Sequence, residues 1–206
     1  TWFRLREWDK GQCESERLAS CILPIECYKN IDPSHPLGGR DDGKDICCEK
    51  DGFKFIVAVY FPRGKKNISE INKKFKSDVA KAKEKDSQGF VFFTNQELTL
   101  SQRAKLRDLA DPLILDIYHL ERIASYLNSP RGYGLRLEYL SIDMTREEQI
   151  SFFNERDQIL LAIKEHLIQK EKEDKKEKQT GINTVIVEQD NSYSYYLFGC
   201  GEKLMD

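Results

Sequence analysis

Residues 46–61 read ICCEKDGFKFIVAVYF, and this stretch decides the fold. Asp51 and Gly52 form a pair that favours two-residue turns in which both positions have positive φ, so residues 46–49 and 53–61 are the predicted arms of a β-hairpin. The second arm is apolar almost without interruption, which is typical of a central strand covered on both faces. The hairpin therefore predicts a sheet buried between two layers.

Helix and strand patterns alternate on both sides of this hairpin. Upstream, residues 14–23 have apolar residues at helical spacing, and residues 24–43 contain three prolines and three glycines, which indicates a loop. Downstream come a helix opened by the capping pattern of Asn67 and Glu70, a strand at 90–94, a helix after Ser101, a strand at 113–118 and a helix at 119–127. We predict an α/β fold with a mixed central sheet flanked by helices on both faces.

The chain divides into three predicted segments: an α/β domain over residues 1–140, a long helix with a charged end over 145–178, and a C-terminal β-hairpin over 182–206. Phe153, Leu160 and Leu167 repeat every seven residues on the long helix. These apolar positions are too many for a solvated helix. The α/β domain, the C-terminal hairpin or a second copy would cover them, and we favour a homodimer through residues 146–168.

Composition indicates a globular protein, because 39% of the 206 residues are hydrophobic. The 33 basic residues nearly cancel the 35 acidic ones, so overall charge does not favour nucleic acid. No apolar run is long enough to span a membrane and the first residues lack a signal-peptide core, which predicts a cytoplasmic protein. The six cysteines show no CxxC pair and the three histidines lie far apart, so we expect reduced thiols and no zinc site.

The sharpest chemical signal is residues 38–45, GGRDDGKD, which place three carboxylates and two basic groups immediately before the hairpin. Hydrolysis of phosphodiesters uses such carboxylates, because a hard divalent cation prefers oxygen ligands and both activates water and neutralises phosphate charge. The competing interpretation is a polar turn in which the glycines supply positive φ and the aspartates cap backbone amides.

This loop, followed by a turn, an apolar strand, a helix and FVFFTNQELT, resembles the PD-(D/E)xK restriction-endonuclease-like superfamily in its GGxDxGxD branch, over about residues 10–130. In that superfamily an early helix supplies a glutamate, the strand after the glycines an aspartate, and the next strand Glu or Gln, a spacer and Lys. The resemblance implies that Glu16 and Asp45 bind Mg²⁺, with Asp42 or Asp41 as the neighbouring acid. It implies phosphodiester cleavage in a bacterial restriction or anti-phage defence system.

The sequence departs from the superfamily in the strand FIVAVYF, which has no Glu, Gln or Lys. Val57-Ala58-Val59, or Ala58 to Tyr60, stands in place of the triad, and a missing lysine removes the group that orients the attacking water. Lys73 and Lys74 in the next helix offer a replacement, with the wet face of an amphipathic helix as the competing interpretation. We expect Asp45 and Glu16 to converge, with Val57 and Val59 facing the place of the missing lysine.

Local charge favours nucleic acid more than the total does. Residues 62–85 contain nine basic and three acidic residues, and neutralising phosphates releases counterions whatever the base sequence. The predicted contacts, to DNA in preference to RNA, are Arg40, Lys44, Arg63, Lys65 and Lys66. The polar residues 94–97 at a strand end are a minor candidate for ligand contacts, with a plain strand-to-helix turn as the competing account.

Two functions therefore remain open. The first is a nuclease-like nucleic-acid-binding domain with Mg²⁺-dependent cleavage. The second is a non-catalytic relative, a pseudo-nuclease that keeps the fold as a recognition or dimerisation module and explains the valine strand directly.

Overall fold

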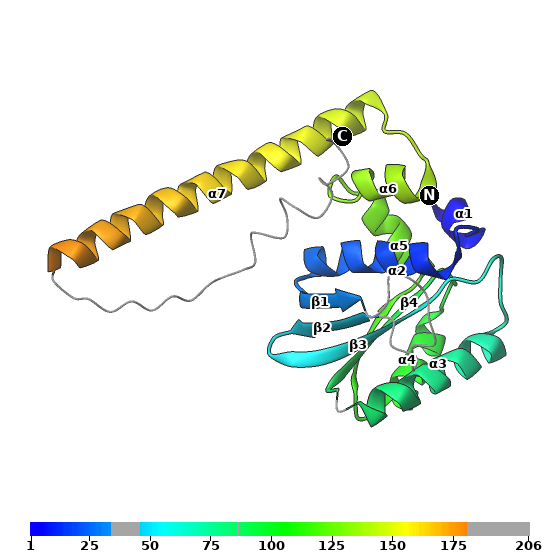
Figure 1. The fold of residues 1–206 in the computed structure, drawn as a ribbon. Coiled ribbons are helices and arrows are strands. Elements are labelled where there is room, and N and C mark those ends of the chain that lie inside the picture. The colour runs from blue at the N-terminus through cyan, green and yellow to red at the C-terminus, as the bar shows by residue number, and fades with distance from the viewer. Residues whose placement is uncertain (34–45, 86, 181–206) are drawn as a thin grey trace. The chain divides into compact units, whose positions relative to one another are not determined.

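The computed structural model describes residues 1–33, 46–85 and 87–180. The chain divides into two compact units, Thr1–Asp143 and Met144–Asp206, each of which is described by itself. In the first unit a five-stranded sheet lies between two layers of helices (Figure 1). The prediction of a mixed central sheet flanked by helices is confirmed.

The strands lie in the sheet in their chain order. The first three pair antiparallel as a meander, and the last three pair parallel. They are β1 (Lys29–Pro33), β2 (Ile46–Lys50), β3 (Phe53–Tyr60), β4 (Gly89–Thr94) and β5 (Ile114–Tyr118). Asp51 and Gly52 have φ of 53° and 79°, as the predicted turn between β2 and β3 requires. The expected central position of β3 is also confirmed, because two strands lie on each side of it.

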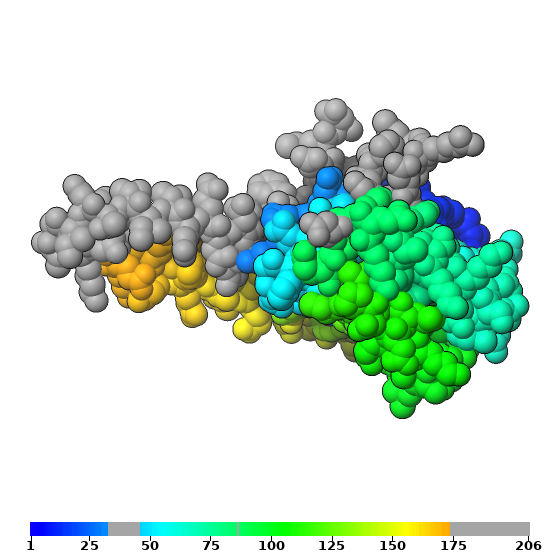
Figure 2. Space-filling view, turned by 90° about the horizontal axis from the view of Figure 1, so that it is seen from below, coloured from blue at the N-terminus to red at the C-terminus, as the bar shows by residue number. Residues whose placement is uncertain are grey.

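Alternate residues of the strands enter two separate cores, because successive side chains point to opposite faces of a sheet. One core packs against α1 (Trp2–Arg6), α2 (Gly11–Ile22), α5 (Leu120–Leu127) and α6 (Tyr133–Leu140), together with the short 3₁₀-helix η1 (Leu23–Glu26). The other packs against α3 (Ile68–Glu84) and α4 (Leu100–Ala110), the two crossovers between the parallel strands. Figure 2 views the molecule from the side on which α3 and α4 lie.

The helix starts follow from local chemistry. Asn67 accepts a hydrogen bond from the backbone N–H of Glu70 at 2.9 Å, so it satisfies one of the donors that the first turn of α3 leaves without a partner. Thr99 and Gln102 form a complete capping box at α4. Each cap follows the loop that leaves a parallel strand, so each crossover helix begins on the side of the carboxyl ends of β3 and β4.

Two predictions about the fold need correction. The interpretation of residues 24–43 as loop is wrong at its start, because η1 and β1 lie there. Proline does not prevent this, since β1 is an edge strand, where a residue without an N–H is tolerated. Sequence patterns also did not identify α1 or α6. Three residues of α6 pack into the core: Leu135, Tyr139 and Leu140.

The described part of the second unit is the helix α7 (Arg146–Thr180). A capping box opens this helix: Glu148 N–H donates to Thr145 Oγ1 at 3.2 Å and Thr145 N–H donates to the Glu148 carboxylate at 3.0 Å. The predicted hairpin over residues 182–206 lies outside the described residues. Within the described ranges, no helix combines the length and apolar character needed to cross a membrane.

Candidate functional site

Glu16 lies on α2 beside the carboxyl end of β3. One turn earlier on the same helix, Gln12 Nε2 donates to Glu16 Oε1 at 2.8 Å and to the backbone carbonyl of Val59 at 2.9 Å. The two contacts orient the half-buried Glu16 carboxylate and tie it to β3. An amide that donates to both groups fixes the position of this carboxylate relative to the carboxyl end of β3.

The strand β3 has apolar residues at the positions where the resemblance predicts an acid and a lysine. Val57 and Val59 are buried in the core that contains α2, the helix that carries Glu16. Ile56 and Ala58 are buried in the other core. Replacing one of these residues by lysine would disturb the packing, because both faces of the strand are filled by packed side chains.

The acidic loop of residues 38–45 lies outside the described residues, and with it Arg40, Asp41, Asp42, Lys44 and Asp45. The predicted approach of Asp45 to Glu16 therefore stays a prediction. The described chain begins again at Ile46, which is paired with Val57 of β3. In residues 1–33, 46–85 and 87–180, no three His, Cys, Asp or Glu side chains gather as a metal site would require.

Lys73 and Lys74 belong to α3, in the helix layer opposite the one that contains Glu16. Lys74 Nζ donates to Asp78 Oδ1 at 2.9 Å, and Asp78 is only 3% exposed. Burial raises the pKa of the Asp78 carboxyl, while the bond and charge of Lys74 lower it. Lys74 therefore balances the charge of the buried Asp78 carboxylate. Lys73 is exposed. The structure does not bring either lysine together with Glu16 in one layer.

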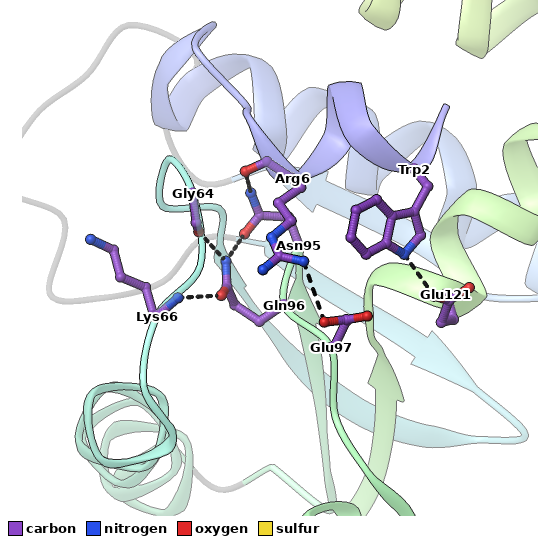
Figure 3. A network of polar contacts seen from close by, with 8 residues as sticks. All are labelled: Trp2, Arg6, Gly64, Lys66, Asn95, Gln96, Glu97 and Glu121. Carbon is purple, nitrogen blue, oxygen red and sulfur yellow. Dashed lines mark hydrogen bonds and ion pairs between the residues drawn. The ribbon is translucent and has the colours of Figure 1, made fainter.

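The basic loop after β3 is held in place by two buried amides (Figure 3). Gln96 Nε2 donates to the Gly64 carbonyl at 3.0 Å, and Gln96 Oε1 accepts from the Lys66 N–H at 2.7 Å. Asn95 Nδ2 donates to the Pro62 carbonyl at 2.9 Å. The two amides thereby satisfy the backbone of the loop, which leaves the side chains of Arg63 and Lys65 exposed.

Asn95 also binds the N-terminal helix. Its Nδ2 donates to the Leu5 carbonyl at 2.9 Å, while its Oδ1 accepts from Gln96. Nearby, Arg6 pairs with Glu97 and Trp2 donates to Glu121 (Figure 3). Asn95 and Gln96 are thus internal supports of a strand-to-helix turn, which is the competing account given above for residues 94–97.

Sequence reasoning missed a second polar cluster between η1, β5 and α5. Arg122 donates to Asp116 and to Glu26, the latter at 3.0 Å, and its guanidinium stacks on the Tyr118 ring at 3.7 Å from the centroid. The Tyr28 hydroxyl donates to Asp116 at 3.0 Å, and burial raises the pKa of Tyr28. One cation therefore neutralises two carboxylates from different elements, so the cluster serves as a clamp. No sequence signal marks it, because its members are scattered along the chain.

No protein-family model and no curated protein matches the chain. The local chemistry is an oriented glutamate and a supported basic loop near the carboxyl end of β3, with an acidic sequence immediately before β2 in the chain.

Proposed function

We propose that the Thr1–Asp143 unit is a nuclease-like nucleic-acid-binding domain of the PD-(D/E)xK type, with Mg²⁺-dependent phosphodiester cleavage in a restriction or anti-phage defence system. The observation that carries this proposal is the attachment of Glu16 to β3 through Gln12. It supports the role that the superfamily gives to a glutamate on an early helix, next to the hairpin that follows the acidic sequence.

Connectivity adds support for the metal ligands. Asp45 is bonded to Ile46, and Ile46 is paired with Val57, two residues before the carbonyl that Gln12 binds. Ile46, which directly follows the acidic sequence, and Glu16 are thus both linked to the stretch of β3 between Val57 and Val59. Oxygen ligands of this kind suit Mg²⁺, which would polarise the phosphate and activate a water molecule.

Charge supports the choice of nucleic acid. Arg63 and Lys65 are exposed on the supported loop that follows β3, and Lys73, Lys76 and Lys83 are exposed on α3. A backbone held by internal hydrogen bonds presents such cations with little loss of conformational entropy on binding. Contacts of this type read the phosphate backbone and not the base sequence.

A second function, a non-catalytic recognition module, is favoured by the packing of β3. Val57, Ala58 and Val59 are all buried, and Lys74 is paired with Asp78. In this form the domain binds nucleic acid through the same loop but does not cleave it. The proposed homodimer through residues 146–168 is common to both functions.

Cleavage of plasmid DNA in Mg²⁺ or Mn²⁺ tests the first function. We expect Glu16→Gln and Asp45→Asn to reduce cleavage by about 100-fold or more, because removal of a ligand should exceed the 10- to 100-fold effect of supporting residues. Glu14→Gln, on the same helix, is the matched control and should cleave normally. Cleavage that is insensitive to Glu16→Gln would reject the proposed site.

Binding is measured separately on a short duplex at several salt concentrations. Arg63→Gln and Lys65→Gln should each weaken binding and reduce the salt slope by roughly one unit, while Lys105→Gln on α4 should not. Binding without cleavage would establish the non-catalytic module. Absence of both would reject the two functions together.

A further inference from the structure

The helix α7 exposes a long apolar surface. Side chains of this size are usually buried, yet Phe153 is 60% exposed, Leu160 52% and Leu167 55%. The full set of large exposed apolar residues on this helix is Ile150, Phe153, Leu160, Leu161, Leu167 and Ile168. A contiguous apolar strip of this kind marks an interaction surface.

Charged residues within the strip indicate what covers it. Ile150, Phe153, Asp157, Leu160, Lys164 and Leu167 follow the alternating three- and four-residue spacing of a coiled-coil seam. Asp157 and Lys164 therefore lie inside the seam, and both are exposed. A partner must supply an opposite charge at each of these two levels, because a charge buried without a counterpart is unfavourable.

A second copy of the same helix meets this requirement in only one orientation. In a parallel pair each residue faces itself, so Asp157 faces Asp157 and Lys164 faces Lys164, which is repulsive. In an antiparallel pair centred between Leu160 and Leu161 the order is reversed. Asp157 precedes Leu160 by three residues and Lys164 follows Leu161 by three, so opposite charges meet on both sides of the centre.

The same centre aligns two further pairs of residues, while Ile150 and Leu167 lie opposite Glu171 and Asn154. Phe153 and Ile168 lie seven residues outside Leu160 and Leu161 and so face each other, while Arg156 and Glu165 lie four residues outside and are also of opposite charge. Six residues of this face are therefore matched under a two-fold axis, which is the requirement for a closed symmetric dimer: Phe153, Asp157, Leu160, Leu161, Lys164 and Ile168.

We propose that α7 forms an antiparallel homodimer centred on Leu160 and Leu161, in which Asp157 of each copy pairs with the partner's Lys164. The apolar residues supply the buried surface, and the two charge pairs determine orientation and register. This proposal does not depend on the nuclease function, since it rests on the second unit alone.

Sedimentation of the full chain at micromolar concentration tests the proposal. We expect a wild-type dimer, and a loss of affinity of about 100-fold for Asp157→Lys and for Lys164→Asp, because each creates two like-charge contacts worth roughly tenfold apiece. The double variant Asp157→Lys, Lys164→Asp restores both pairs and should dimerise like the wild type. Gln158→Lys, on the other side of the helix, is the control and should dimerise normally.

Three results would overturn the proposal. A monomeric wild type would show that no second copy covers the strip. Single reversals without effect would exclude the antiparallel pairing, and a double variant that stays monomeric would exclude the pairing of Asp157 with Lys164. Loss of nuclease activity in Glu16→Gln leaves each of these outcomes unchanged, so the two proposals fail separately.

Discussion

Replacing Asn95 by leucine removes the hydrogen bonds that join α1, β4 and the basic loop, while keeping nearly the same shape. Asn95 is fully buried, and its amide contacts the Leu5 and Pro62 carbonyls and Gln96, each at 2.9 Å. The substitution removes one hydrogen bond from each of these three partners in the interior. It therefore tests whether this turn is an internal support.

The expected loss follows from those three contacts. A typical hydrogen bond contributes about 1 kcal/mol, and a buried group left unsatisfied costs about 1–3 kcal/mol. Because water or local movement compensates part of this, we expect the free energy of unfolding to fall by about 3–5 kcal/mol. For a unit of this size that corresponds to a decrease in Tm of roughly 10 °C or more.

Urea denaturation and thermal melting, followed by circular dichroism, measure the change. Asn72→Leu on α3 is the matched control, because Asn72 is only half-buried, and it should change the free energy of unfolding by less than about 1 kcal/mol. A loss in Asn95→Leu as small as that of the control would refute the assignment of Asn95 as a support.

Two further predictions concern buried titratable groups. Because the folded pKa of Asp78 is raised, its contribution to stability is present below the unfolded pKa of about 3.8 and is lost as pH rises through the folded pKa. The free energy of unfolding of Asp78→Asn should therefore rise relative to that of the wild type over this window in urea titrations, while Asp108→Asn tracks the wild type. Burial raises the pKa of the Cys48 thiol to about 12, so iodoacetamide at pH 8 should modify exposed Cys27 in the native protein and reach Cys48 only on unfolding, as mass spectrometry would show. Rapid native modification of Cys48 would contradict its burial.

Elements specified by short-range chemistry were predictable from the sequence. The turn at Asp51 and Gly52 needs only two residues with positive φ, and the cap at Asn67 needs only a partner three residues later. The uninterrupted apolar run of β3 likewise indicated its central position, since a strand covered on both faces has no polar alternation.

Elements specified by tertiary packing were not predictable in this way. The strand β1 contains Asn30 with positive φ and ends in proline, so local propensity opposes it, and its pairing with β2 stabilises it. The Arg122 clamp joins Asp116 to Glu26, and Glu26 lies 96 residues before Arg122 in the sequence. For the candidate site, the sequence indicated Glu16 but not the role of Gln12, because a glutamine four residues earlier has no distinctive pattern.

The bond between Asn95 and the Leu5 carbonyl also affects the order of events during synthesis. The two residues are 90 positions apart, so at about 5–20 residues per second the ribosome adds Asn95 several seconds after Leu5. Until then Leu5 lacks this interior partner, and the helix around it is too short to be stable alone. The segment around Leu5 thus lacks this contact until Asn95, which follows the fourth strand directly, has been synthesised.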